Sequence, residues 1–338
     1  MGENLLEKNR MVKKIIKNKK SVVSIVIVNY NGKDLIKLIL DSVKEINSNH
    51  YYEVFVVDNN STDNSQEYIK KKYPKVKLIQ NKKNLGYSGI NSALKYCKGE
   101  YILFLNNDMK IDKTCISKLI ETIKSDKNVA MAAPKLINFY NKTLKSGGTW
   151  VSRSFYNGHI KGNGNKMTKE IPYLGVGLIK KDYVDTFGYL FDPDYFIYAE
   201  DLDLGLRIRL IRKKIIFNPD AIIYHMHAVT TKKSKRYKMT FLLERNLLMT
   251  FFKILSTKNI LLLFPYVFGM RALAITKDLL TFNISNFIAR LRAIIWIFFN
   301  FGLIMKKRKH LQKIRKADDN YVLKIFTEKY LFKKKFLI

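Results

Sequence analysis

The sequence predicts an α/β protein with an open, Rossmann-like mixed sheet flanked by helices, followed by a helical C-terminal region. Short runs of β-branched residues alternate with helical patterns between residues 22 and 105, which is typical of such sheets. Polar turn residues follow directly after these runs. Beyond about residue 230 the alternation stops, and long apolar stretches separated by basic residues indicate helices.

A β-α-β unit opens the predicted sheet. A strand is expected at Val22–Val28, where few polar positions interrupt the β-branched run, as in a strand buried on both faces. The turn Asn29–Gly32 ends this strand, and apolar residues at helical spacing predict a helix over Asp34–Val43. A second buried strand is expected at Glu53–Val57.

The alternation continues with four more expected elements, namely a helix at Ser65–Lys72, a strand at Val76–Gln80, a helix at Gly89–Cys97 and a strand at Tyr101–Leu105. Segment Asn138–Lys169, which includes Gly162–Asn165, is rich in Gly, Asn, Ser and Lys and is predicted to be a mobile loop. Ligands of open α/β sheets bind beyond the carboxyl ends of the strands, so polar residues at these ends are the candidates for a site.

Composition excludes a disordered chain, because 47% of the 338 residues are hydrophobic, enough for a large domain with an appendage. The net charge of +34 predicts attraction to nucleic acid, anionic lipid or phosphorylated substrates, or simply a Lys-rich solvated surface. Cys97 and Cys115 lack the spacing of a zinc site or a disulfide scaffold, in keeping with a reducing cytoplasm. Residues 1–20 are too interrupted by Lys and Asn for a secretion signal, so the folded body is expected in the cytoplasm.

Acidic residues follow two of the predicted strands. Asp58 comes directly after the second strand, and Asp108 lies just beyond the strand that ends at Leu105. A carboxylate at such a position can bond a base or ribose, or ligate Mg²⁺ or Mn²⁺ where a diphosphate must leave. It can equally cap a helix or shape a turn. We take Asp108 as the metal candidate.

Two further features could contact a phosphate or a metal ion. Gly86, before a predicted helix, would let the backbone approach a phosphate closely, although glycine is also ordinary punctuation before a helix. His225 and His227 follow a short strand with one residue between them, so on an extended segment both side chains point to the same side. They are either ligands or structural histidines.

Glu200 and Asp201 open a helix that is predicted by the spacing of Leu202, Leu206 and Leu210. The helix dipole favours acids on an opening turn, which explains them as caps. The same dipole keeps a carboxylate ionised at neutral pH, which is the state that a general base needs to take a proton from an acceptor hydroxyl. Both interpretations stand on this segment alone.

Four blocks, in this order and spacing, resemble the inverting nucleotide-sugar glycosyltransferases of family two, which have the GT-A fold. The blocks are Val23–Gly32, Val56–Asp63, Asn84–Tyr87 leading to Leu105–Asp108, and Gly175–Gly177 leading to Glu200–Asp203. The resemblance is closest to rhamnosyltransferase-like members, which build surface polysaccharides. It implies a GT-A catalytic domain at residues 21–235, after a basic leader at 1–20 and before a helical, basic C-terminal region at 236–338.

The resemblance also implies residue roles in a single in-line displacement that uses Mg²⁺ or Mn²⁺. Asp201 matches the catalytic base, and Glu200 would position or orient the acceptor. Asp108 matches the last acid of the DXD-type metal motif, whose first acid is Asn106 here, and His225 matches a histidine that helps hold the metal or diphosphate. The residues expected to bind the nucleotide-sugar are Asn29, Tyr30, Asn31, Asp58, Asn60, Asn84, Gly86, Asn107, Gly175 and Gly177.

The C-terminal region carries the apolar segments Ile260–Phe268 and Ile294–Phe299, which are short and lie near Arg271 and Arg290. We therefore expect interfacial or re-entrant helices rather than spanning ones. The polybasic segment Lys306–His310 predicts peripheral binding to an anionic cytoplasmic leaflet, where a lipid-linked glycan acceptor would be anchored. The alternatives are a helical lid, a dimer interface or one transmembrane pass.

Two other classes of protein are disfavoured. A nucleotidyltransferase on a similar sheet would need a Gly-rich, Arg-bearing loop after the first strand, where this chain has Asn31–Asp34. A nucleic-acid-binding protein would interleave basic and aromatic residues on one element or contain a recognisable reading module, and the sheet half of the sequence has neither.

Overall fold

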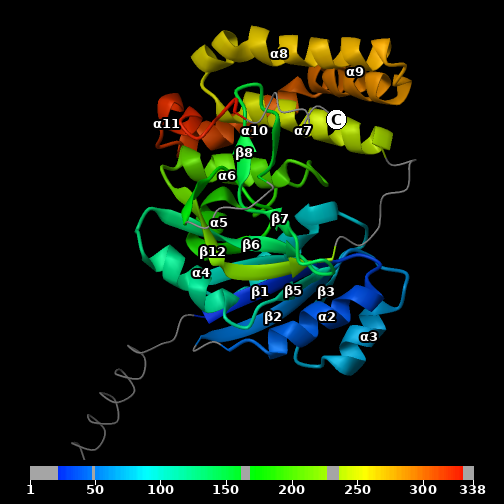
Figure 1. Ribbon diagram of the computed structural model, residues 1–338, viewed down its shortest axis with the longest axis vertical. Helices are drawn as coiled ribbons and strands as arrows, with labels where there is room; N and C mark the ends of the chain where they lie inside the picture. Colours follow the sequence, from blue (N-terminus) through cyan, green and yellow to red (C-terminus); the bar gives the residue numbers. More distant parts are fainter. Residues whose placement is uncertain (1–21, 48–49, 161–167, 227–235, 330–338) are drawn as a thin grey trace, which may run out of the picture.

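The computed structural model describes residues 22–47, 50–160, 168–226 and 236–329 (Figure 1). Three parts of the sequence discussed above lie outside these residues, namely the predicted leader at 1–20, the glycine-rich stretch Gly162–Asn165 and His227. The described strands form one ten-stranded mixed sheet flanked by helices, together with a separate two-stranded hairpin.

The first half of the chain alternates strands and helices as expected. The strands are β1 (Val22–Asn29), β2 (Tyr51–Asp58), β3 (Lys77–Gln80) and β4 (Tyr101–Asn106), and the helices are α2 (Lys33–Lys44), α3 (Ser65–Lys72) and η1 (Gly86–Tyr96). The expected α-helix at Gly89–Cys97 is wrong in type, because η1 is a 3₁₀ helix. Its glycine, serine and asparagine residues are poor α-helix formers, which favours the shorter, tighter helix.

The second half of the sheet region contains shorter strands. Its elements are β5 (Met109–Ile111), α4 (Cys115–Lys124), β6 (Val129–Asn138), β7 (Leu144–Ser146), β8 (Thr149–Val151), β9 (Asn157–His159), β10 (Lys169–Ile171), β11 (Gly177–Lys180), α5 (Lys181–Phe187), α6 (Glu200–Leu210) and β12 (Lys214–His225). The mobile loop predicted from Asn138 is wrong for its described part. There β7 pairs with β6, and β8 pairs with β9 to form the hairpin. Trp150 and Phe155 are buried, and Phe155 anchors this polar segment in an apolar cluster.

The sheet brings the ends of its central strands to one edge. Its order is β10-β12-β6-β11-β4-β1-β2-β3, with β1 parallel to both β2 and β4, and β11 antiparallel to β4 and β6. In this register Asn29 lies opposite Asp58, Asp58 lies opposite Gln80, and Val28 lies opposite Asn106. The polar residues that follow β1, β2 and β4 therefore meet at one edge.

The C-terminal helices are α7 (Arg236–Ile254), α8 (Thr257–Leu280), α9 (Ile284–Phe299), α10 (Phe301–Ile314) and α11 (Asp319–Leu323). One apolar core fills the space between the sheet and its helices, and a second core joins α6 to α7 and the helices that follow. Figure 1 shows α8 and α9 at one end of the molecule, with α2 and α3 at the other. Since α6 begins with Glu200, the second core lies directly behind the predicted catalytic helix.

Candidate active site

The ends of β1, β2 and β4 are joined by side-chain hydrogen bonds. Asn29 is fully buried, and its Nδ2 donates to Asp58 Oδ1 at 3.0 Å. The Oδ1 atom of the same amide accepts from Asn107 Nδ2 at 2.7 Å. One asparagine therefore fixes the relative positions of the three segments that were predicted to bind the nucleotide.

Asp58 is buried, and its carboxylate is used within the turn that follows β2. Besides Asn29, it accepts from the Ser61 amide at 2.8 Å, from Ser61 Oγ at 2.6 Å and from Gln66 Nε2 at 2.7 Å. These four bonds support the turn-shaping interpretation of Asp58. Its predicted contact with a base stays a prediction, and it would require one of these donors to be exchanged.

The first two turns are also bonded to each other, which leaves one aromatic side chain on the surface. The Asn31 amide donates to Ser61 Oγ at 2.9 Å, and Asn31 Oδ1 accepts from the Thr62 amide at 2.8 Å. Asn31 and Asn60 have left-handed backbone angles, with φ of 47° and 65°. Tyr30, 49% exposed, is the side chain of the first turn that is open to stack against a ligand.

Gly86 is required by a close backbone contact. Its φ is 63°, and a Cβ atom there would lie 1.9 Å from the carbonyl oxygen of Phe196. The Asn84 side chain accepts from the Gly86 amide at 2.9 Å, and the Tyr87 amide donates to the same Phe196 carbonyl at 2.8 Å. The missing side chain makes room for the loop before α6, so phosphate binding is not needed to explain this glycine.

Asp108 and His225, the two predicted metal ligands, lie side by side. His225 Nε2 is 3.1 Å from Asp108 Oδ1, and the Met226 amide donates to the Asp108 carbonyl oxygen at 2.9 Å. Asn106, at the first position of the DXD-type motif, instead donates to the Tyr87 hydroxyl at 2.8 Å. Within the described parts of the chain, no group of three or more His, Cys, Asp or Glu could hold a metal ion. A carboxylate and an imidazole still fit Mg²⁺ or Mn²⁺, because these ions keep waters and phosphate oxygens as their other ligands.

At the start of α6, Glu200 is buried and Asp201 is half-buried, and Asp201 lies close to residues from another segment. Asp201 Oδ1 accepts from the Leu202 amide at 2.8 Å, and a Cβ atom on Gly175 would lie 3.3 Å from Asp201 Oδ2. Gly177, in contrast, packs inside the sheet against the Ala132 carbonyl. Of the predicted glycine pair, Gly175 is therefore the one beside the proposed base.

Burial, rather than the helix dipole, dominates the ionisation of these two acids. It raises the pKa of Asp201 to about 6. Burial, with the neighbouring Asp201 charge, raises the pKa of Glu200 well above its usual value, and Glu200 Oε2 has no hydrogen-bond partner. The pKa of half-buried Tyr87 is raised by loss of solvation and by the charges of Glu200, Asp108 and Asp201. Sequence reasoning missed Tyr87 as the residue whose hydroxyl accepts from Asn106 of the DXD-type motif.

The loop before α6 has an unusual backbone. Phe196, Tyr198 and Ala199 have φ of 62°, 71° and 60°, which side-chain-bearing residues seldom adopt. The buried Asn246 of α7 donates through Nδ2 to the carbonyls of Tyr198 at 2.7 Å and Tyr195 at 3.0 Å. Helix α7 thus stabilises the loop that delivers Glu200 and Asp201 to the sheet edge.

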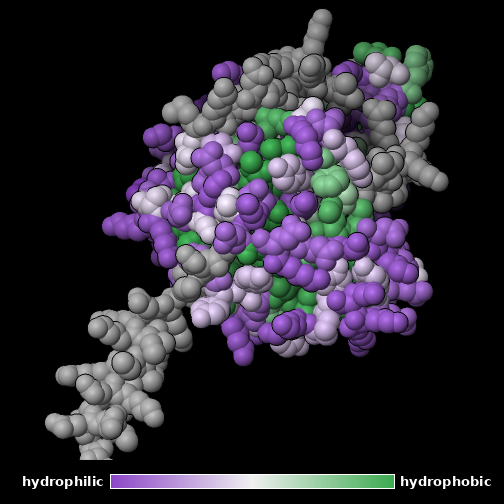
Figure 2. All heavy atoms as spheres, turned by 60° about the horizontal axis from the view of Figure 1, so that its bottom comes forward, coloured by the Kyte–Doolittle hydropathy of each residue, from purple (hydrophilic) through white to green (hydrophobic). Residues whose placement is uncertain are grey.

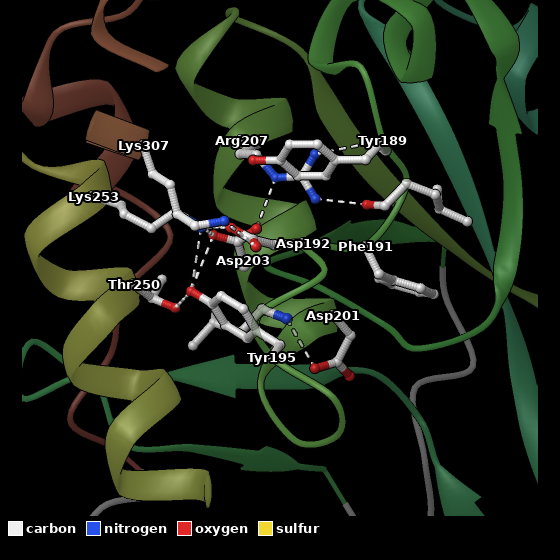
Figure 3. A network of polar contacts seen from close by, with 12 residues as sticks. Tyr189, Phe191, Asp192, Tyr195, Asp201, Asp203, Arg207, Thr250, Lys253 and Lys307 are labelled. Atoms are coloured by element: carbon white, nitrogen blue, oxygen red, sulfur yellow. Dashed lines mark hydrogen bonds and ion pairs between the residues drawn. The ribbon is translucent and has the colours of Figure 1, made fainter. Parts of the chain in front are cut away.

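A buried ionic cluster fastens α6 to the C-terminal helices (Figure 3). Lys253 Nζ of α7 lies 2.6 Å from Asp192 Oδ2 and 2.7 Å from Asp203 Oδ1, and all three side chains are fully buried. Lys307 of α10 pairs with Asp192 at 2.5 Å, and Arg207 pairs with Asp203 at 2.8 Å. Burial alone would lower the pKa of Lys253, but the charge of Asp203 raises it well above the usual value. No sequence motif marked this cluster, although Lys253 interrupts an otherwise apolar run.

The fold is that of the GT-A class of glycosyltransferases. Residues 24–176, a little under half of the chain, match the sequence profile of glycosyl transferase family 2. Figure 1 shows the arrangement that this class shares, a central mixed sheet with flanking helices.

Individual relatives agree with this assignment. The chain is 45% identical over 92 residues to poly(ribitol-phosphate) beta-glucosyltransferase of Bacillus spizizenii, covering 25% of this chain and 14% of that protein. It is 35% identical over 108 residues to UDP-Glc:alpha-D-GlcNAc-diphosphoundecaprenol beta-1,3-glucosyltransferase WfaP of Escherichia coli, covering 31% and 43%. The matches thus span less than half of either relative.

A solved structure supports the fold. GalNAc-T7, crystallised with UDP, GalNAc and Mn²⁺, superposes with a TM-score of 0.67 at 15% identity, covering 91% of this chain and 56% of that one. At this level of identity the likeness concerns the fold, and it confirms the predicted GT-A architecture.

Proposed function

We propose that the protein transfers a sugar from a nucleoside diphosphate-sugar to an acceptor hydroxyl with inversion, in the synthesis of a surface polysaccharide or related glycan. The observation that carries this proposal is Asp201, a half-buried carboxyl beside Gly175 whose pKa is raised to about 6. Such a group is ionised at neutral pH yet basic enough to accept a proton from a hydroxyl as it attacks. In this proposal Asp201 is the general base, and Glu200 beside it orients the acceptor.

The proposed donor site lies along the edge formed by β1, β2 and β4. Tyr30 would stack against the base, and the bonded turns containing Asn29, Asn31 and Asn60 would set the shape of this part of the site. Asn84 and Gly86 would line it from the other side. A rhamnosyl donor is favoured by the sequence resemblance, and other hexosyl donors are tested in the same experiment.

We further propose that Asp108 and His225 hold Mg²⁺ or Mn²⁺. Their side chains already meet, at 3.1 Å, beside the proposed donor site. The ion would neutralise the charge that develops on the departing diphosphate. The Mn²⁺ in the GalNAc-T7 structure supports a divalent ion in this fold class.

The proposed acceptor is a lipid-linked glycan at the cytoplasmic face of a membrane. The Escherichia coli relative is named for a diphosphoundecaprenol-linked substrate. The basic, apolar C-terminal helices of this chain suit the same setting.

The first experiment follows release of nucleoside diphosphate from a panel of UDP-, dTDP- and GDP-sugars, with Mn²⁺, Mg²⁺ or EDTA. Metal-dependent release by the parent chain, lost in Asp201→Asn and in Asp108→Asn, would support the proposal and identify the donor. Asp182→Asn, which changes an exposed acid of α5, is the matched control and should retain activity. Failure of every donor to bind or react, together with steeply salt-dependent binding of nucleic acid, would overturn it.

A further inference from the structure

The outward side of the α8–α9 hairpin is covered by large apolar side chains. The most exposed of them are between 69% and 86% accessible, namely Leu261, Leu262, Leu280, Phe282, Phe298 and Phe299. Surface patches of this kind mark sites that meet another apolar partner. By contrast, Figure 2 shows mostly hydrophilic side chains on the face toward α2 and α3, with smaller hydrophobic areas between them.

Three charged residues of the hairpin, Arg271, Asp278 and Arg290, point inward and are paired there. Arg271, 1% exposed, donates to the Ser154 carbonyl at 2.8 Å, and its Nε lies 3.4 Å from Glu244 Oε2 of α7. Arg290 of α9 pairs with Glu244 as well and with Asp278 of α8, at 2.8 Å in the latter case. These contacts attach both helices to the protein by their polar sides.

This orientation bears on how the hairpin could meet a membrane. Helix α8 is long and apolar enough to cross a bilayer by length and composition, and the bent pair α9 and α10 passes the same test together. Crossing would require Arg271 and Asp278 to leave their partners and enter hydrocarbon, which is costly. A helix lying in the plane of the interface keeps those contacts and buries only its outer, apolar side.

The charged residues of the hairpin and of α10 indicate which kind of partner surface the hairpin would bind. Residues 257–314 contain a single acid, Asp278, and it is buried. The exposed cations of this stretch are Lys258, Lys277, Arg292, Lys306, Lys309 and Lys313. A second copy of the chain would bring these cations against one another without an exposed acid on either hairpin to pair with them. Anionic headgroups complement both the cations and the apolar side chains.

We propose that the α8–α9 hairpin is a docking surface that lies in the plane of an anionic lipid bilayer, with its outer side chains in the headgroup and upper acyl region and the lysines of α10 against the headgroups. This inference deepens the proposed membrane location of the enzyme and rests on it. It concerns a surface remote from the β1, β2 and β4 edge, so it is tested by lipid binding, separately from sugar transfer.

The test is flotation of the full chain with vesicles of phosphatidylglycerol and phosphatidylcholine, and with phosphatidylcholine alone. We expect binding to the anionic vesicles that weakens as salt is raised. The double variant Phe298→Ser and Phe299→Ser should bind at least about tenfold less, because it removes two large apolar side chains that would be buried in the bilayer. Tyr140→Ser is the matched control, because this equally exposed aromatic lies on the turn after β6.

A charge variant and a depth measurement complete the design. Lys306→Gln with Lys309→Gln should reduce binding to anionic vesicles and its salt dependence, whereas Lys75→Gln should not. A Leu262→Trp reporter should be quenched more by lipids brominated near the headgroup than by lipids brominated near the chain end. Stronger quenching by the deep bromines would overturn in-plane docking in favour of a spanning helix.

Two other outcomes would also overturn the proposal. One is absence of binding to anionic vesicles by a chain that still cleaves its donor, which would leave the proposed transferase activity intact. The other is a stable dimer that Phe298→Ser with Phe299→Ser dissociates, which would assign the hairpin to a second copy of the chain. Lipid binding by a chain that cleaves no donor would instead retain the surface and remove the proposed function.

Discussion

Asp201 and Asp203 are two residues apart on α6, yet their surroundings are opposite. Asp203 is enclosed by Lys253 and Arg207, at 2.7 and 2.8 Å. Asp201 accepts one backbone hydrogen bond, and burial raises its pKa to about 6. Figure 3 shows Asp201 pointing away from the Lys253 cluster. A run of acids in a sequence can thus divide into one carboxylate that is paired with cations inside the protein and one whose raised pKa suits the proposed general base.

Removing the positive charge of Lys253 should have the largest effect on stability. Lys253→Met is expected to lower the free energy of unfolding by about 3–5 kcal/mol, because it leaves Asp192 and Asp203 buried without their shared partner. Urea unfolding followed by circular dichroism measures the change. Lys124→Met, at an exposed position on α4, is the control and should change stability little. A loss below about 1 kcal/mol, the range of a surface pair, would show that the cluster is not structural.

Changing the other acid should affect the rate instead of the fold. Asp201→Asn is expected to lower turnover by about 10²–10⁴-fold, the usual contribution of a general base. Its unfolding free energy should stay level or rise at neutral pH, because the variant no longer buries an unpaired charge there. Initial rates with the identified donor and urea unfolding test both parts. A variant that unfolds as readily as Lys253→Met would remove the distinction between the two acids.

The pH dependence sharpens the same comparison. With a pKa raised to about 6, Asp201 should make kcat/KM rise with pH up to about 6 and level off above it. The sign is opposite for stability. The folded chain holds this proton more tightly than the unfolded one, so the contribution of Asp201 to stability is complete below about pH 3.9 and is lost as pH rises through about 6. Between about pH 3.9 and 6, kcat/KM should therefore rise with pH while the free energy of unfolding contributed by Asp201 falls. A flat rate profile would argue against Asp201 as the base.

Lys307→Met should have the smallest effect. Lys307 also pairs with Asp192, at 2.5 Å, but it is partly exposed, and Lys253 would still neutralise that carboxylate. We expect a loss of about 1 kcal/mol in the free energy of unfolding, measured by the same urea method. A loss as large as that of Lys253→Met would mean that the two lysines act as one unit, which the double variant would then show.

The sequence was most informative where structure is local. Strands β1, β2 and β4 follow from their short apolar runs, and their order places the polar ends together. The meeting of Asp108 with His225 was reached through the family resemblance, since it depends on pairing between β5 and β12, far apart in the chain. Hairpin β8–β9 was missed because its few apolar residues, such as Trp150, carry no periodic signal.

The ionic cluster was missed for a different reason. Its members come from the loop before α6, from α6 itself and from α7 and α10. The sequence of each segment does not indicate which of the others it contacts. A lone lysine within the apolar run around Lys253 was the available signal, because a buried lysine needs an acid. The sequence located Arg271 and Arg290 near the apolar segments but did not indicate their partners. In the structure Arg271 lies beside Glu244, and Arg290 pairs with Asp278.

The Lys253 cluster also constrains how this chain can vary among its descendants. Residues 192, 203 and 253 share charges in a space closed to water, so we expect a neutral substitution at one of them to be tolerated only if another changes with it. These positions should therefore vary together across close homologues, although Lys253 lies 61 positions after Asp192 and 50 positions after Asp203. We therefore expect that exchanging α7 between relatives would require exchanging α6 as well, because Lys253 of α7 and Asp203 of α6 belong to one buried cluster.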